Sequence, residues 1–434
     1  MIDSLHIKRW IQIGLRSTIA RNVASLYTIQ FANYIVPLIM IPYLVRVLGP
    51  AGYGTVAFGQ GLINYFMVFV EYGFNWSATR KISVHRNDTQ AVNGIALYVW
   101  LAKGLLALIG FGILLALIGM VPKLSKDFLL LLILYGLVLG NVLFPTWLFQ
   151  GMERMVAISL INLGMKLGVL IGVFSLIRKP EHYLLYAFLM SFGSVLSGMT
   201  GMIVAFRMFR LRLKRVTWSG VWETLKEGWV LFLSRASVNL YTAGNAFILG
   251  MLTNNTIVGY YSAAEKVVKS ILGLLDPIAQ ATYPRFSKLA AESRDRTLAW
   301  GQRMIIVMGG IGLLLMVGVL WGAPFISALL LGSGFESSIA VMRVLAPIIF
   351  LIALSNVLGI QLMLPLGRDK AFTLILFAAG ILNIILAMAF APPWKALGMA
   401  VAVLISESFV TIIMFAYLYI INNNVLTINK RSKI

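Results

Sequence analysis

Polar and ionisable side chains recur at matching positions in two apolar stretches of the chain. Gln60, Asn64 and Glu71 have a spacing that places them on one helix face. With a constant offset of 205 residues and no gap, the second stretch aligns with the first as an internal repeat. The aligned pairs include Gln30 with Arg235, Tyr34 with Asn239, Gln60 with Glu265, Asn64 with Lys269, and Glu71 with Asp276. A polar stripe on a membrane helix must face away from lipid, so we expect both stripes to line one central cavity.

Six basic residues lie inside predicted membrane spans, where a charge costs at least about 3 kcal/mol and normally faces a protein interior or water. They are Lys103, Lys166, Arg235, Lys266, Lys269 and Arg343. Lys103 and Arg343 lie near span ends, from which a long side chain could reach the interface. Lys166, Arg235 and Lys269 lie deeper in their spans, so their side chains are expected to face a cavity. Arg235 has no acidic residue within one turn, and its guanidinium matches phosphate oxygens, which makes it the first candidate for binding an anion.

Carboxylates at membrane depth form a second group of candidates, comprising Glu71, Glu265, Asp276 and Glu407. Such groups can exchange protons or bind sodium, so H⁺ or Na⁺ coupling is possible and no bound cofactor is expected. Glu265 can also neutralise Lys269, its i, i+4 neighbour. The absence of cysteine excludes disulfides, cysteine metal sites and thiol nucleophiles, and the three histidines lie in span flanks, so we predict no metal site.

The composition requires a membrane fold to position these groups. Of 434 residues, 60% are hydrophobic and 12% are charged, and the mean hydropathy is +0.89. Backbone polar groups in hydrocarbon must be satisfied within each segment, so the long apolar runs must be helices. We predict twelve spans, near residues 20–45, 52–78, 92–120, 128–149, 155–177, 183–206, 228–252, 257–283, 303–331, 338–364, 371–391 and 396–421.

The longest polar connection lies at the midpoint of the chain and separates six spans from six. We predict an all-α integral membrane protein with two six-helix lobes related by a pseudo-two-fold axis along the membrane normal. Its parts are a cytoplasmic or interfacial N-terminus (1–19), the first lobe (20–206), a cytoplasmic linker (207–227), the second lobe (228–421) and a cytoplasmic tail (422–434).

The loops differ strongly in basic residues, which predicts the orientation of the chain. The segments on the side of both termini hold 24 Lys and Arg residues, and the loops on the other side hold six. Basic loops stay in the cytoplasm, so both termini are predicted to be cytoplasmic. Topology therefore explains the net charge of +21, and no nucleic-acid partner is expected.

Several segments also have a recognisable family pattern: Leu48–Gly54 (LGPAGYG), Tyr72–Lys81 (YGFNWSATRK), Leu233–Ala236 (LSRA), Val258–Lys266 (VGYYSAAEK) and Tyr283–Phe286 (YPRF). They resemble the Wzx-type O-antigen flippases, which move lipid-linked oligosaccharides. These flippases belong to the polysaccharide-transport branch of the multidrug/oligosaccharidyl-lipid/polysaccharide exporter superfamily. The resemblance covers nearly the whole chain.

The resemblance implies a twelve-helix, multi-pass protein of the bacterial inner membrane that acts in lipopolysaccharide biosynthesis. Its cargo would be an oligosaccharide linked to undecaprenyl diphosphate, moved from the cytoplasmic to the periplasmic leaflet, and no catalysis is implied. Membrane lipid, an O-antigen polymerase and a chain-length regulator are the implied partners. Lipid II flippases of the same superfamily have arginines in the first helix, whereas the first span here has Gln30 and Asn33, so a peptidoglycan precursor is less expected.

With this cargo, only the polar head needs a cavity, because the polyprenyl tail can stay in lipid. The residues expected to bind the diphosphate are Arg235, Lys269, Lys166 and Lys266. The residues expected to face the glycan are Gln30, Asn64, Asn239 and Asn245. The two lobes are expected to rock against each other and so alternate access to the cavity.

Two alternatives remain open. A drug or cation exporter of the same superfamily would share the fold, but it should recognise cations with carboxylates or aromatic groups, and the excess of deep bases disfavours it. A membrane oligosaccharide polymerase or ligase would act on the same cargo. Such enzymes usually have a long external loop, whereas every predicted external loop here is short.

Overall fold

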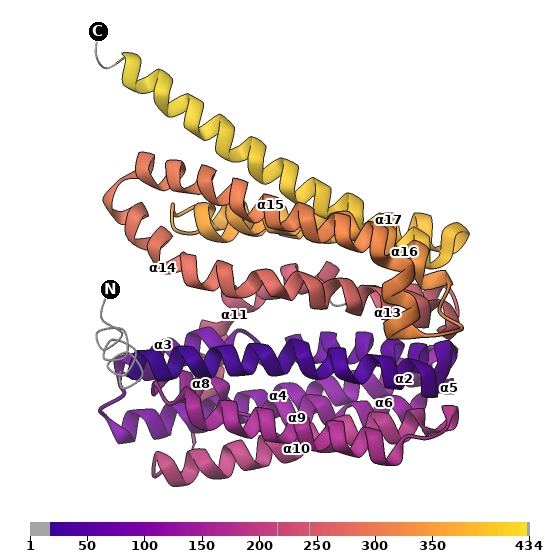
Figure 1. The fold of residues 1–434 in the computed structure, drawn as a ribbon. Coiled ribbons are helices and arrows are strands. Elements are labelled where there is room, and N and C mark those ends of the chain that lie inside the picture. The colour runs from indigo at the N-terminus through magenta and orange to yellow at the C-terminus, as the bar shows by residue number, and fades with distance from the viewer. Residues whose placement is uncertain (1–17, 215, 243, 432–434) are drawn as a thin grey trace, which may run out of the picture. The chain divides into compact units, whose positions relative to one another are not determined.

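The computed structural model describes the backbone of residues 18–214, 216–242 and 244–431 (Figure 1). The side chains of residues 18–35, 37, 230–231, 233–238, 240–242 and 421–431 are not described. The chain is 89% helical, and no strand occurs in the described part. Seven helical stretches among the described residues are long and apolar enough to cross a membrane, so the chain is a multi-pass membrane protein. The predicted N-terminal segment 1–19 lies almost entirely outside the described residues.

The helices group into two units by their contacts. The first unit comprises Met1–Met40 and Ile63–Arg235, and the second comprises Ile41–Leu62 and Ala236–Ile434. The long helix α2 (Thr18–Glu71) therefore contributes to both, because its middle belongs with the second unit. The lobe predicted from the sequence instead runs without interruption over residues 20–206.

The other helices of the first unit are α3 (Phe74–Val84), α4 (Thr89–Met120), α5 (Pro122–Lys126), α6 (Phe128–Leu134), α7 (Gly136–Leu143), α8 (Thr146–Gly151), α9 (Met155–Leu176), the turn η1 (Pro180–His182), α10 (Tyr183–Met208) and the start of α11 (Trp218–Thr242). Helix α4 begins where the Asp88 carboxylate accepts hydrogen bonds from the backbone N–H of Gln90 (2.9 Å) and of Ala91 (3.0 Å).

The second unit continues with the end of α11, then α12 (Asn245–Leu252), α13 (Asn255–Leu272), η2 (Gly273–Leu275), α14 (Asp276–Glu292), α15 (Arg294–Ile326), η3 (Ser327–Leu331), α16 (Ser337–Asn356), η4 (Val357–Met363) and α17 (Asp369–Arg431). Helix α17 is interrupted at Lys395 (φ 54°, ψ −128°) and so consists of two helical parts. Asn254 caps α13 by accepting a hydrogen bond from the Ile257 N–H (3.0 Å).

Small residues allow the helices of the first unit to approach closely. A Cβ atom on Gly198 of α10 would lie 2.6 Å from the backbone oxygen of Gly140 of α7, and a Cβ on Gly140 would lie 2.1 Å from the Ser194 hydroxyl oxygen. Contacts of this kind hold membrane helices together because lipid provides no hydrophobic force between them.

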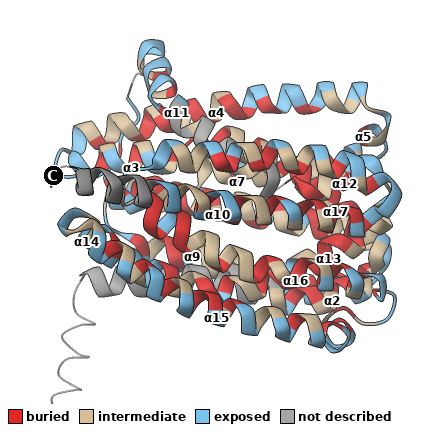
Figure 2. Cartoon of the chain, turned by 90° about the horizontal axis from the view of Figure 1, so that it is seen from above, coloured by how far each residue is buried: buried red, intermediate tan, exposed pale blue. Residues whose placement is uncertain are grey.

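In the second unit, helices α15, α16 and α17 and the turn η4 surround an apolar core. Buried residues lie on the sides of the helices that face their neighbours (Figure 2). The core members include Phe286, Met304, Met308, Val357, Met363, Val410 and Met414.

The first helix break recurs at the offset of the sequence repeat, whereas the second recurs four residues short of it. The backbone of α2 is non-helical at Gly49 (φ 64°), and the connection between α12 and α13 contains Asn254, 205 residues later. The next breaks follow Glu71, at Tyr72 (φ 48°) and Gly73 (φ 77°), and Leu272, at the turn η2. The stretches 52–78 and 257–283, each predicted as one span, are therefore not single continuous helices.

Two repeat-related glycines pack closely within the second unit. A Cβ on Gly54 would lie 1.8 Å from the Asn255 carbonyl oxygen, and a Cβ on Gly259 would lie 2.0 Å from the Pro50 carbonyl oxygen. Pro50 and Asn255 are also 205 residues apart, so the contact is symmetrical. The Asn255 amide donates a hydrogen bond to the Thr55 hydroxyl (2.8 Å) beside it. Only glycine fits at both positions without movement of the backbone.

We predict that Gly259→Ala lowers the free energy of unfolding by about 1–3 kcal/mol, because the added methyl group overpacks this contact. Gly310→Ala is the matched control, because no atom lies within 4 Å of its Cβ position on α15. The control should be neutral, or stabilising by up to about 1 kcal/mol. Denaturant unfolding of both variants in detergent measures the difference, and equal shifts would contradict the packing described.

Candidate functional site

The predicted site residues fall in both units. The side chains of Gln30 and Arg235 lie outside the described residues, so their roles stay predictions. The first unit contains Asn64 on α2, Lys166 on α9 and Glu71, all partly buried. The second unit contains Asn239, Asn245, Glu265, Lys266, Lys269, Asp276 and Glu407.

The predicted charge pair on α13 is present. Glu265 and Lys269 form an ion pair of 3.0 Å between a carboxylate oxygen and the ammonium nitrogen. The Lys269 side chain is 49% exposed, whereas that of Glu265 is 18% exposed. The Tyr261 hydroxyl donates a further hydrogen bond to the Glu265 carboxylate (3.2 Å). Glu265 is thus held from two sides, and about half of the Lys269 side chain is exposed.

A second carboxylate approaches this pair from α17. Glu407 is only 6% exposed and interacts electrostatically with Lys269. Helices α13 and α17 are in contact within the second unit, which brings together residues that are far apart in sequence. Lys266 lies one residue after Glu265 and is exposed. Two acidic and two basic residues therefore form one mixed cluster, which we name the α13–α17 cluster: Glu265, Lys266, Lys269 and Glu407.

Asn245 adds an amide next to this cluster. It is 2% exposed on α12, and its side chain is hydrogen-bonded to Tyr261, the residue that binds Glu265. Its amide oxygen has no hydrogen-bond partner among the described residues. A buried acceptor without a partner is costly, so Asn245 is suited to accept a hydrogen bond from a ligand. Asn239 is partly buried on α11.

Asp276 lies beyond the end of α13. The α-helix ends at Leu272, the 3₁₀ turn η2 follows, and Asp276 is the first residue of α14. The role of Asp276 in the polar stripe therefore stays a prediction.

The first unit has its own charged group, centred on Lys103. Lys103 on α4 is 2% exposed, and its ammonium group donates to the backbone oxygen (2.6 Å) and to the side-chain oxygen (3.0 Å) of Asn141 on α7. Lys103 also interacts electrostatically with Glu71, which accepts a hydrogen bond from the Asn75 amide (2.7 Å). The alternative that Lys103 reaches the interface is therefore wrong, because its ammonium group turns inward.

Sequence reasoning missed Asn141 and Tyr261. Asn141 lies in the apolar run of residues 128–149, and an amide at that depth indicated a buried partner. Tyr261 lies one turn before Glu265, which placed its hydroxyl within reach of that carboxylate. Both signals were present, but the spacing indicates a partner only for Tyr261, because Asn141 binds Lys103 on another helix.

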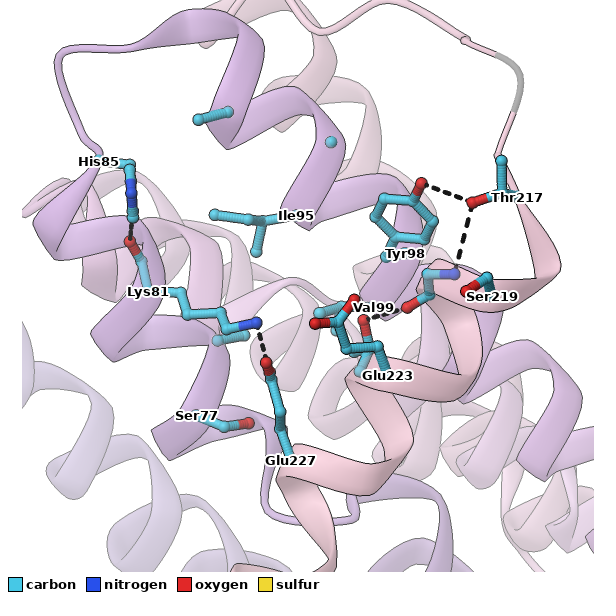
Figure 3. A pocket seen from close by; sticks show the side chains of 15 residues that line it. Ser77, Lys81, His85, Ile95, Tyr98, Val99, Thr217, Ser219, Glu223 and Glu227 are labelled. Carbon is cyan, nitrogen blue, oxygen red and sulfur yellow. Dashed lines mark hydrogen bonds and ion pairs between the residues drawn. The ribbon is translucent and has the colours of Figure 1, made fainter.

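A cavity of about 500 Å³ lies in the first unit between α3, α4 and the start of α11 (Figure 3). An ion pair between Lys81 and Glu227 crosses it, and the hydroxyl groups of Tyr98 and Thr217 are 3.2 Å apart at its edge. Glu223 also faces the cavity (Figure 3). Side chains of both charge signs line this cavity together with apolar ones such as Ile95 and Val99.

The arrangement suits binding better than covalent chemistry. Each unit has acidic and basic groups paired inside the membrane region, and a ligand with charges and hydroxyl groups can exchange partners with them. No group of three or more metal-binding side chains is found within the described part of the chain.

Comparison with protein families gives one match: a model described as "Polysaccharide biosynthesis protein" covers residues 19–290. Two relatives are provisionally assigned O-antigen transporters. The one from Escherichia coli (strain K12) is 31% identical over 409 residues, covering 94% of this chain and 98% of the relative. The one from Shigella dysenteriae is 29% identical over 405 residues, covering 91% and 98%.

Solved structures resemble the chain in fold. A lipid II flippase, MurJ, in an inward closed conformation has a TM-score of 0.68 at 13% identity, covering 92% of this chain and 85% of that one. An inward-facing multidrug resistance MATE family transporter of the MOP superfamily has a TM-score of 0.63 at 14% identity, covering 88% and 97%. At these identities the likeness concerns the fold alone.

We predict that Lys103→Met lowers the free energy of unfolding by about 3–5 kcal/mol, because one member of a buried charged group is removed. Lys126→Met on α5 is the control, since Lys126 is exposed and should tolerate the change within about 0.5 kcal/mol. Thermal unfolding in detergent compares the two. A Lys103→Met protein as stable as the wild type would contradict the buried contacts with Asn141.

Proposed function

We propose a transport function from one established premise: the chain belongs to the polysaccharide biosynthesis protein family. It is a flippase that moves an oligosaccharide linked to undecaprenyl diphosphate, of the O-antigen type, from the cytoplasmic to the periplasmic leaflet. The names of the two curated relatives support an O-antigen cargo. The fold likeness to a lipid II flippase is consistent with a lipid-linked head group passing through this architecture.

The proposed architecture has twelve spans in two six-helix lobes in the bacterial inner membrane, with both termini in the cytoplasm. The lobes are residues 20–206 and 228–421, joined by the cytoplasmic linker 207–227. Helix breaks at Gly49 and at Asn254, one repeat apart, support two lobes of common design. The distribution of Lys and Arg supports the orientation.

The observation on which the proposal depends most is the geometry of Lys269. Its ammonium nitrogen lies 3.0 Å from a Glu265 carboxylate oxygen, its side chain is 49% exposed, and the buried Glu407 interacts with it from α17. A diphosphate can approach this exposed side chain and compete with Glu265 for the ammonium group by charge-assisted hydrogen bonds. Lys266 is exposed beside it, and Arg235 and Lys166 are the further proposed contacts.

Amide groups are the proposed contacts for the glycan. Asn245 has a buried amide oxygen without a partner among the described residues, so a sugar hydroxyl could donate to it. Asn64 and Asn239 are partly buried and retain the same proposed role, as does Gln30. The polyprenyl tail needs no such contacts, because it is soluble in lipid.

Transport proceeds by alternating access, and the membrane potential supplies a driving force. Moving a negative charge outward across a membrane that is negative inside is favourable by about 2.3 kcal/mol per charge per 100 mV. Coupling to H⁺ or Na⁺ through Glu71, Glu265, Asp276 or Glu407 is a further proposal. An O-antigen polymerase and a chain-length regulator are proposed partners.

We predict that Lys269→Ala reduces flipping of the lipid-linked oligosaccharide about 10- to 100-fold, as expected for the loss of a charged hydrogen bond of about 1.5–3 kcal/mol. Lys288→Ala is the matched control. Lys288 also pairs with a glutamate at i, i+4, at 3.8 Å from Glu292, but its side chain is 79% exposed on α14. Lys269→Arg should retain part of the activity.

The assay uses the full chain in liposomes with a fluorescent undecaprenyl-diphosphate oligosaccharide in both leaflets. An external quencher reports the exchange between leaflets for wild type and variants. Equal loss in the Lys269 and Lys288 variants would contradict the assignment of Lys269. Transport of a drug cation without any oligosaccharide exchange would contradict the flippase and favour a drug exporter.

A further inference from the structure

The first half of α11 has a row of exposed tryptophans. Trp218, Trp222 and Trp229 are 67%, 64% and 49% exposed. They are separated by four and seven residues, which places all three on one face of the helix. Isolated exposed apolar residues are ordinary, but three large aromatic side chains on one face form a surface that requires a partner.

The buried side of α11 borders this row, because Val221 and Leu225 each follow a tryptophan by three residues. Val221 and Leu225 are buried, and a Cβ on Gly220 would lie 2.2 Å from the Tyr98 ring. A Cβ on Gly228 would lie 2.9 Å from the Tyr72 ring. The Tyr72 ring stacks on the Phe232 ring, with 4.8 Å between the two centroids. The ion pair between Lys81 and Glu227 adds a further link within the first unit (Figure 3). With α11 held by these contacts, each of the three tryptophan side chains stays about half exposed or more.

The chain segment before α11 is rich in exposed bases: Arg207, Arg210, Arg212 and Lys214. Its backbone is held in place, because the Asn93 amide donates to the Arg212 oxygen (2.9 Å) and accepts from the Arg212 N–H (2.8 Å). On α11 itself, Glu223 and Glu227 line the cavity of the first unit and so lie away from the tryptophan row. Aromatic and basic groups therefore occur together, with the acidic groups on another side.

We propose that the first half of α11 and the segment before it form a docking surface for anionic phospholipid. The tryptophans lie at the boundary between head groups and acyl chains, where indole rings are favoured because one side is apolar and the other is wet. The bases bind the lipid phosphates of the same leaflet, which attract basic segments next to a membrane. This surface is independent of the cargo.

Because the chain has no cysteine, a single cysteine can be introduced and labelled to report which face of α11 contacts lipid. Trp222→Cys and the neighbouring Glu223→Cys are labelled with bimane in the full chain, with Trp218→Cys as a second variant if the first is poorly folded. The vesicles contain phosphatidylcholine and an equal fraction of brominated phosphatidylglycerol or brominated phosphatidylcholine. We expect quenching by brominated lipid to be at least about twofold stronger at position 222 than at position 223, since only the first faces the interface. Equal quenching at both positions would overturn the proposal.

The anionic preference is tested on the same labelled protein. Brominated phosphatidylglycerol should quench position 222 more than brominated phosphatidylcholine, and Arg210→Gln/Arg212→Gln/Lys214→Gln should abolish that difference. The control Lys288→Gln/Arg294→Gln/Arg296→Gln removes the same number of bases elsewhere and should preserve it. Equal quenching by the two lipids in the parent, or equal effects of both triple variants, would overturn the assignment of anionic lipid.

Discussion

A charged side chain in hydrocarbon is stable only when the protein supplies its partners, and both units depend on this constraint. Lys103 in the first unit is almost fully buried and donates to a carbonyl and an amide oxygen of Asn141. Lys269 in the second unit is paired with Glu265 and interacts with Glu407. The first arrangement leaves no open side on the ammonium group, whereas the second leaves Lys269 half exposed. Because of this difference in exposure, we propose Lys269, and not Lys103, as a contact for an anionic head group.

Breaks between helices determine where such charges can lie. Glycine at positions 54 and 259 lets two repeat-related helix starts approach closely, and the backbone breaks at Gly49 and Asn254 precede them. The later breaks, after Glu71 and Leu272, end the helices that present the polar residues. The spacing of 205 residues therefore relates the aligned polar side chains and also the first backbone break in each half.

Much of the fold could be predicted from the sequence, because in lipid a long apolar run has few alternatives to a helix. The repeat could also be predicted, as could the pair Glu265 and Lys269, since helical spacing alone brings these two together. The positions of the breaks could not, because Tyr72 adopts a left-handed conformation that its residue type does not favour. The link from Lys103 to Asn141 and that from Lys269 to Glu407 join distant parts of the chain, and periodicity contains no information about them. The exposed fraction of each basic side chain could not be predicted either: Lys103 is 2% exposed, whereas the Lys269 side chain is 49% exposed.

The central claim is that Glu265 and an anionic head group compete for the ammonium group of Lys269. Binding of undecaprenyl diphosphate to the purified wild type and to Glu265→Gln, measured by thermophoresis in detergent, tests this most directly. The amide removes the competing charge while preserving the size of the side chain, so the account predicts binding about tenfold tighter in the variant, equivalent to about 1.4 kcal/mol. Equal or weaker binding by Glu265→Gln would contradict the claim and place the anion site elsewhere.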